Sequence, residues 1–349
     1  MKKILIILIL LISNFVFGQN QNIPAYFNYI NQAELAIVNN DYKSGLKYYE
    51  KAFKNHDEPF NYDYQNALLC SCQLEKKQSV KAYFIALKQR EVDLENIEKK
   101  CVQNMGETYW NELKQLNISI TIDTIYRQKL EEVLSKDQSI RYYSLQKNPN
   151  NHYAHNGDTI RFVDSLNLLE LERFIDEKGF PTEAVVGSYF GFYLSIKHNQ
   201  QWKRNDFDSI LYEQVLRGGF SPYVYAFLHD YWVDNFDKGR LTYRVETAYL
   251  INGKMYFDYW KTESDIDSLR SEIYMESVSE QREKIKSDKK AEGFSFHGGG
   301  YVAILSGLDD MMANRLISGF EESRINYENS KKNDTHTERK TQKKNKRGN

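Results

Sequence analysis

The sequence predicts a mainly α-helical protein with one small β-hairpin. Apolar residues recur at intervals of three and four through most of the chain, which is typical of helices with one buried face. A pattern of small and aromatic residues repeats within residues 25–93. The pair Asn252-Gly253 favours a two-residue hairpin turn, and it stands between β-prone residues in 241–260. The 349 residues, 41% of them hydrophobic, suffice for two domains.

Residues 1–18 have the pattern of a signal peptide. Lys2 and Lys3 form a short positive region, Ile4 to Ile12 are all apolar, and Gly18 precedes the expected cleavage point. The apolar run is short for a membrane span, so a retained anchor is the alternative. The cleavage point has no cysteine, which argues against lipoprotein processing. We therefore expect a periplasmic or secreted protein without a transmembrane segment in the mature chain.

Residues 25–93 contain an internal repeat. Small, turn-forming and aromatic residues recur 34 positions apart, at Ala33, Asp41-Tyr42, Gly45-Leu46, Tyr48-Tyr49 and Ala52-Phe53, and again at Ala67, Lys76, Ser79, Tyr83 and Ala86-Leu87. The spacing resembles a pair of tetratricopeptide repeats, in which small residues let paired helices approach closely. The resemblance implies helical hairpins over about 19–117, with residues 94–116 as a degenerate third repeat or a cap.

Such a module either binds a peptide on its surface or serves as packing for the next domain. The residues that we expect at a binding surface are Lys47, Tyr48, Lys51, Lys54 and Tyr83. The lysines would suit an acidic peptide, although a solvated helix face explains them equally well.

Three cysteines, Cys70, Cys72 and Cys101, do not make a disulfide framework or a zinc motif. Cys70 and Cys72 fit the role of small packing residues in a helix. In an exported protein, Cys101 could instead form a disulfide with either of them.

The alternating β-branched residues of 118–122 predict a short extended connector and a domain boundary. A second helical domain is expected over 124–280. Its centre is a helix that begins near Asp158 and ends at Gly179, followed by a second helix that runs from Pro181 to His198. Gly187 and Gly191 would form a smooth groove on that second helix, where another helix or a ligand could approach the main chain, and helix packing is the favoured interpretation.

Several spaced motifs of this second part are similar to an uncharacterised bacterial domain of unknown function, over about residues 126–280. The matching positions are Asp137-Gln138 with Arg141, Asp164 with Asn167, Gly179 with Pro181, Val186-Gly187, His198, and Leu228 with Asp230. The family often has a Gln-x-Tyr-Gly-Thr stretch before the hairpin, where this chain has residues 241–246 instead. The resemblance implies no known activity.

Asp137, Arg141 and His198 are the candidate catalytic residues, because they are the polar residues that coincide with this family pattern and they could line a cleft between helices. His152, His155 and Asp158 are the local group closest to a metal site, but no further ligand follows at a zinc-site interval, so no metal or other cofactor is expected.

The last part, 281–330, is expected to contain a charged stretch that forms a solvated helix or a linker, then a glycine-rich turn and a C-terminal helix. His297-Gly298-Gly299-Gly300 is typical of an esterase oxyanion loop, but no Gly-x-Ser-x-Gly motif accompanies it. Residues 331–349 are rich in lysine and predict a disordered basic tail, which could contact anionic surface polymers weakly. Since the net charge is -1, the rest of the chain is acidic, which argues against nucleic-acid binding by the folded part.

These patterns favour an exported, non-enzymatic component of the bacterial envelope that binds a protein or peptide or takes part in assembly. The alternative is an envelope hydrolase or transferase whose cleft contains Asp137, Arg141 and His198. Convergence of these three side chains in a pocket would weaken a purely structural role, whereas their placement on different faces or in full contact with solvent would exclude the alternative.

Overall fold

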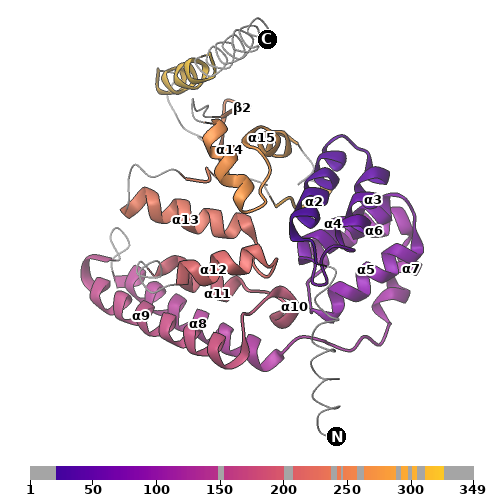
Figure 1. Cartoon of the computed structure of the whole chain (residues 1–349), viewed down its shortest axis with the longest axis horizontal. Helices are drawn as coiled ribbons and strands as arrows, with labels where there is room; N and C mark the ends of the chain where they lie inside the picture. The colour runs from indigo at the N-terminus through magenta and orange to yellow at the C-terminus, as the bar shows by residue number, and fades with distance from the viewer. Residues whose placement is uncertain are drawn as a thin grey trace, which may run out of the picture.

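A computed structural model describes residues 21–147, 153–199, 207–236, 242–244, 247–257, 263–287, 292–297, 301–304 and 311–325. This part of the chain is mainly helical with one small sheet, so the predicted fold class is confirmed (Figure 1). The predicted signal peptide, residues 148–152 and the basic tail lie outside the described residues. None of the helices in the described part is long and apolar enough to cross a membrane.

The first part consists of three pairs of helices: α2 (Ile23–Val38) with α3 (Tyr42–Ala52), α4 (Asn61–Gln73) with α5 (Lys77–Gln89), and α6 (Glu95–Met105) with α7 (Glu107–Lys114). The Asn22 and Asp41 side chains accept hydrogen bonds from main-chain N–H groups in the first turns of α2 and α3. Gly106 interrupts the helix expected near residues 94–116 and makes it a third pair.

A disulfide joins Cys72 of α4 to Cys101 of α6, whereas Cys70 is a buried free thiol. The interpretation of Cys72 as a small packing residue is therefore wrong, and the alternative of a disulfide with Cys101 is correct. The two cysteines of α4 behave differently because only one of them faces α6.

The chain then runs through a connector at residues 117–121, where the sequence predicted an extended segment and where no regular secondary structure is assigned. It continues into two long helices, α8 (Thr124–Lys147) and α9 (Tyr153–Lys178). Helix α11 (Phe190–His198) packs against both of them, and Figure 1 shows α8 and α9 along the lower edge of the molecule. Helices α12 (Phe207–Leu216) and α13 (Pro222–Phe236) follow. Buried apolar residues of both predicted domains form one cluster, so the boundary near 117–124 does not separate two cores.

The prediction of one helix from Pro181 to His198 is wrong. A single-turn helix α10 (Glu183–Val186) ends at Gly187, and α11 begins three residues later. Gly187 has φ +76°, and a Cβ atom there would lie 2.5 Å from the main-chain oxygen of Arg90. Close approach to the end of α5 therefore requires glycine and breaks the helix. Gly191 does lie against another helix, because a Cβ atom there would be 3.1 Å from the main-chain oxygen of Leu130 in α8.

The predicted hairpin is present as β1 (Thr247–Ile251) and β2 (Lys254–Phe257), joined at Asn252-Gly253, both with positive φ. A third strand, β3 (Tyr301–Ile304), pairs with β1 in parallel, so the order is β2-β1-β3. We predicted a glycine-rich turn that leads directly into a helix at this point. The strand forms because β1 offers a free edge, a contact that local sequence does not reveal. Residues 311–325 form the expected C-terminal helix.

Helices α14 (Glu263–Glu272) and α15 (Val278–Lys286) complete the described elements. The prediction of a solvated charged helix is wrong for α15, in which Gln281, Arg282, Lys284 and Ile285 are buried. This helix packs against α2 at the other end of the chain, and acidic groups there neutralise its lysine. A capping box between Ser277 and Glu280 fixes its first turn.

Candidate functional site

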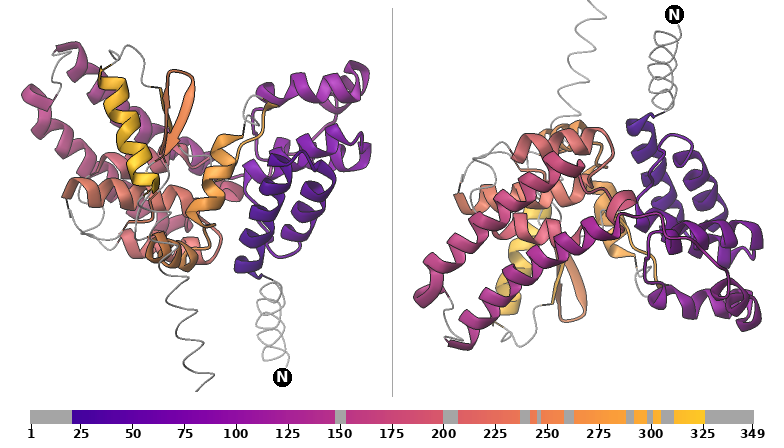
Figure 2. Two further views of the ribbon diagram at one scale, coloured as in Figure 1. Left: turned by 90° about the horizontal axis from the view of Figure 1, so that it is seen from above. Right: turned by 90° about the horizontal axis from the view of Figure 1, so that it is seen from below.

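Residues 292–297, which we call the strap, lie against the first helices of the three pairs. Figure 2 shows this orange segment between the indigo and purple helices α2–α7 and the rest of the molecule. Its contacts with the helix pairs come from α2, α4 and α6 and from Tyr42 at the start of α3, and we call the surface that these elements present to the strap the inner face. Tyr223 of α13 also stacks on the ring of His297. A segment near the end of the chain therefore occupies a surface built by its beginning.

Asn66 of α4 binds the main chain of the strap in both directions. The Ser295 N–H donates to Asn66 Oδ1 at 3.0 Å, and Asn66 Nδ2 donates to the Ser295 carbonyl oxygen at 2.6 Å. Asn66 is fully buried, and its amide also contacts the Tyr49 hydroxyl at 3.0 Å. Because these bonds involve peptide groups, they hold an amino-acid chain without reading the side chain of Ser295.

His297 lies between two buried carboxylates. Its Nε2 atom is 2.9 Å from Asp63 Oδ1, and its main-chain N–H donates to Glu34 Oε1 at 2.9 Å. The Tyr26 hydroxyl donates to the other oxygen of Asp63. Burial alone lowers the pKa of His297, but the Asp63 and Glu34 carboxylates outweigh burial and raise this pKa to about 9. His297 is therefore an imidazolium at neutral pH.

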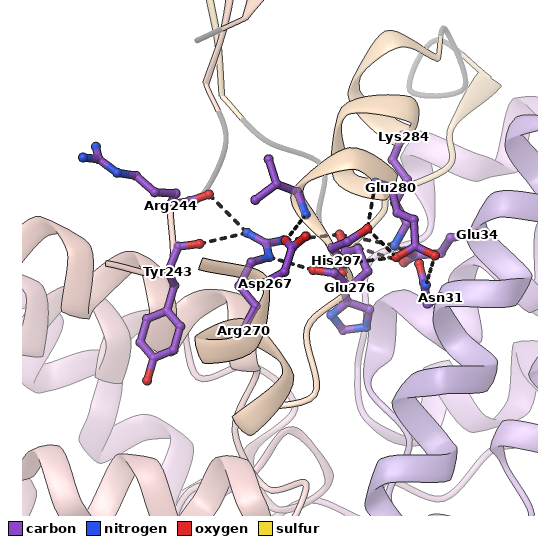
Figure 3. Close-up of polar contacts among 12 residues, drawn as sticks. Asn31, Glu34, Tyr243, Arg244, Asp267, Arg270, Glu276, Glu280, Lys284 and His297 are labelled. Carbon is purple, nitrogen blue, oxygen red and sulfur yellow. Dashed lines mark hydrogen bonds and ion pairs between the residues drawn. The ribbon is translucent and has the colours of Figure 1, made fainter. Parts of the chain in front are cut away.

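Lys284 of α15 is the second cation of this site (Figure 3). Its Nζ atom lies 2.5 Å from Glu34 Oε2 and 3.5 Å from Glu276 Oε1, and the three side chains are fully buried. Burial lowers the pKa of Lys284, but the two carboxylates outweigh this effect and the pKa is raised. Burial raises the pKa of Glu276.

Arg270 of α14 extends the network toward the second part of the chain. Its Nε–H donates to the Glu276 carbonyl oxygen at 2.6 Å, and its NH1 group donates to the carbonyl oxygens of Tyr243 and Arg244. Cations and carboxylates then balance within the buried group, which consists of Arg270, Lys284, His297, Glu34, Asp63 and Glu276. Such a balance is what allows charges to remain buried.

Aromatic and apolar contacts hold the beginning of the strap. The ring of Phe294 is stacked on that of Tyr42 at 5.7 Å, and the Tyr42 hydroxyl donates to Glu292 Oε2 at 2.8 Å. Gly293 has φ +93°, and a Cβ atom there would lie 3.6 Å from the side chain of Leu69 and 3.7 Å from that of Ile97. The strap therefore contacts all three helix pairs.

Glu34, Asp63 and His297 have ligand atoms within 4.8 Å of one another, a spacing that a metal ion could bridge. These atoms already have protein partners: Lys284 and the His297 N–H occupy the two oxygens of Glu34, and Tyr26 and His297 occupy those of Asp63. A metal ion would also stand beside the Lys284 ammonium. The donor set therefore fits a hydrogen-bonded ion cluster better than a metal centre.

The five predicted binding residues lie elsewhere, on or next to the second helices of the pairs. Lys47 and Lys54 are exposed, and the Lys51 ammonium lies 5.2 Å from the rings of both Tyr29 and Tyr48. Tyr83 packs edge-on against Phe53. Within the described part of the chain, the contacts of the strap come from other residues, so binding by these five stays a prediction.

The sequence signals for the inner-face residues are weak. Glu34 follows the repeat position Ala33, and Asp63 looks like an ordinary acidic residue in the first turn of a helix. For His297, the signal is the run of glycines after it, which lie outside the described residues.

Asp137, Arg141 and His198, the candidate catalytic residues, do converge. Arg141 NH1 lies 2.8 Å from Asp137 Oδ1, and His198 Nδ1 lies 2.9 Å from Asp137 Oδ2. Arg141 NH2 binds both oxygens of Asp164, at 2.8 and 2.9 Å. Burial raises the pKa of Asp164, although Arg141 opposes this effect. The sequence pointed to Asp164 only through a family pattern, and the structure adds it to the group.

This convergence fixes the orientation of His198. Asp137 is fully buried and binds Nδ1, so an Nδ1–H tautomer leaves the Nε2 lone pair free, and 22% of the side chain is exposed. A cavity of about 510 Å³ next to Arg141 is also lined by Gln138 and Tyr142, but His198 is not part of its wall. The group has a candidate base, whereas both terminal nitrogens of Arg141 are already bound to carboxylates.

Large apolar side chains are exposed on α8 and α9. A groove of about 850 Å³ between the two helices is lined on one side by Ile140 and Tyr143 and on the other by Leu166 and Leu169. The last three of these are about half exposed, at 52%, 49% and 58%. Of the predicted metal-like group, His152 and the side chain of His155 lie outside the described residues, and Asp158 pairs with Arg161.

No protein-family model, no curated protein and no solved structure matches this chain.

Proposed function

We propose that the protein is an exported interaction or assembly component of the bacterial envelope and is not an enzyme. The observation that carries this proposal is the seating of the strap on the inner face. Asn66 and Glu34 bind peptide groups of the strap rather than its side chains, a mode suited to holding another stretch of protein.

The resemblance to tetratricopeptide repeats supports the same function, because stacked helical hairpins commonly present binding surfaces. Two exposed regions are available to a partner: the lysines around α3 and the apolar groove on α8 and α9. Contiguous exposed apolar surface is typical of interaction sites. The predicted signal peptide supports export.

The test begins with capture of envelope proteins by the immobilised full chain without residues 1–18, followed by calorimetry with each captured protein. We expect saturable binding at a fixed stoichiometry with Kd of about 0.1–10 μM, as for transient complexes. Heat-unfolded chain is the control for nonspecific capture. Capture of the same proteins by folded and unfolded chain, or the lack of any saturable complex, contradicts the proposal.

Surface variants then identify the region used. Lys47→Glu, Lys51→Glu and Lys54→Glu combined should weaken binding of an acidic partner about tenfold or more. The matched control reverses three exposed lysines around α5, Lys76, Lys81 and Lys88. In a separate variant, Leu166→Lys with Leu169→Lys removes apolar contact area from the α8–α9 groove. An equal effect of the control triple would exclude the lysines around α3.

A second candidate function is an envelope hydrolase or transferase. The Asp137–His198 contact favours it, because a buried carboxylate that orients an imidazole is the arrangement of a general base. Its test is hydrolysis of a panel of carboxylic and phosphate esters by the full chain and by His198→Gln. Turnover that requires His198 and follows one ionisation with pH would replace the binding proposal, and equal rates for both proteins would exclude the hydrolase.

A further inference from the structure

We propose that the strap is a built-in occupant of a peptide-binding groove, and that the inner face also accepts a partner segment with an aromatic residue followed three positions later by a cation. This inference rests on the proposed function and names the chemistry of the partner. The strap shows the pattern: Phe294 is the aromatic residue and His297 is the cation.

The cation requirement follows from the charges of the inner face. Asp63 and Glu34 are fully buried, and His297 supplies an imidazolium to one and a main-chain N–H to the other. Among the described residues, a neutral side chain in place of His297 would leave Asp63 with the Tyr26 hydroxyl as its one side-chain donor. An acidic side chain would place a further carboxylate beside Glu34 and Asp63. Histidine, lysine and arginine are therefore the side chains that fit.

The aromatic requirement follows from Tyr42, whose ring is nearly parallel to Phe294 with an interplanar angle of 7°. Before this position the chain must turn tightly past Leu69 and Ile97, and Gly293 does so with a φ that other residues rarely adopt. Between the two anchors, Asn66 binds only the peptide groups of Ser295. Phe296, between Ser295 and His297, packs against the hydrophobic core. The partner pattern is thus glycine, aromatic, any residue, apolar, cation.

The strap can leave without α15. That helix is held on α2 by its own contacts, Lys284 with Glu34 and Asn31 with Glu280. The strap is tethered, so it competes at an effective concentration of about 1 mM, and a free peptide binds the intact protein weakly. A partner segment gains access when it brings further contacts elsewhere on the surface.

The test uses a fluorescent peptide with the strap sequence Gly-Phe-Ser-Phe-His-Gly and the full chain carrying Phe294→Ala and Ser295→Pro. These changes remove the stacked ring and the N–H bound by Asn66 and leave the buried charges in place. We expect the variant to bind the peptide at least about tenfold more tightly than the unchanged chain, because the competing strap is weakened. Asn66→Ala in the same background should abolish binding.

The matched control peptide has glutamate in place of its histidine and should bind at least about tenfold more weakly. A variant that has a normal circular dichroism spectrum but binds no peptide at about 1 mM overturns the inference. If that variant does not fold, hydrogen exchange of the Ser295 and His297 amides in the unchanged chain decides. Faster exchange with added peptide supports displacement, and unchanged exchange at about 1 mM overturns it.

These outcomes are separable from failure of the proposed function. If the peptide does not bind but captured envelope proteins still form saturable complexes, the proposal that the inner face binds a partner segment is wrong, and the proposed function is unaffected. If the peptide binds but no envelope protein does, peptide binding by the inner face is supported and the proposed role in the envelope is wrong.

Discussion

Replacement of Lys284 by methionine tests the buried charge cluster most directly. Methionine keeps most of the apolar stem and removes the ammonium, which lies 2.5 Å from Glu34 and 3.5 Å from Glu276. Both carboxylates are fully buried, so neither can recruit bulk water without rearrangement. Glu34 keeps the His297 N–H, and Glu276 keeps Arg270 at 3.8 Å.

Removal of one partner from a buried ion pair costs about 3–5 kcal/mol, and the contacts that remain place the expected loss of unfolding free energy within that range. The companion variant Lys284→Met with Glu34→Gln also removes one of the stranded carboxylates. It should lose less, about 1–3 kcal/mol, since the amide needs only hydrogen bonds. An exposed lysine, Lys81→Met, should change stability by less than about 0.5 kcal/mol and serves as the matched control.

The loss should depend on pH in a defined direction. Burial and the nearby Glu34 carboxylate raise the pKa of Glu276, and Lys284 opposes them. Without Lys284 this opposing effect is lost, so protonation of Glu276 relieves its repulsion with Glu34 as the pH falls. The single variant should therefore lose less stability at about pH 5 than at about pH 8. Urea unfolding followed by circular dichroism measures both values. A loss below about 1 kcal/mol at pH 8, or a larger loss at pH 5, would refute the role of Lys284 as the counter-ion.

Three further predictions concern other elements. The raised pKa of His297 contributes stability that is complete below the ordinary histidine pKa of 6.5 and is lost as the pH rises through about 9. Urea unfolding should therefore show a fall in unfolding free energy across this window, and His297→Gln should remove that fall. Loss of the Cys72–Cys101 disulfide, which spans 29 residues, should cost about 3–4 kcal/mol in urea unfolding, and an unchanged midpoint after reduction would contradict this. Gly187→Ala should destabilise the protein by about 1–3 kcal/mol more than Gly253→Ala. Both glycines have positive φ, but only the new methyl group at position 187 would clash, with the main-chain oxygen of Arg90. Melting curves of the two variants measure the difference.

Local rules predicted the helices and the hairpin well. Small residues at repeat spacing mark the close helix pairs, and Asn252-Gly253 marks the turn between β1 and β2 because few residues tolerate its backbone conformation. Two structural features that the sequence did not predict have a common cause. The break at Gly187 arises from contact with the end of α5, and β3 arises from pairing with β1. Both depend on residues far away in the chain.

The sequence explains part of the convergence of Asp137, Arg141 and His198, whose catalytic role stays a prediction. Asp137 and Arg141 are four residues apart on one helix, so their contact follows from helix geometry. Contact of His198 with Asp137 requires that α11 pack against α8, which the sequence suggested only through a family pattern. Binding by the lysines around α3 and export of the chain stay predictions.

The sequence by itself determined the helical class, the repeat spacing and the hairpin, because each depends on neighbours within a few turns. Only the tertiary structure decided that the charged residues of α15 are buried and that the strap lies on the inner face. Lys284 and Glu34 are 250 residues apart, and His297 and Asp63 are 234 apart. The residues that flank a lysine in the sequence do not distinguish one that neutralises a buried glutamate from one that faces water.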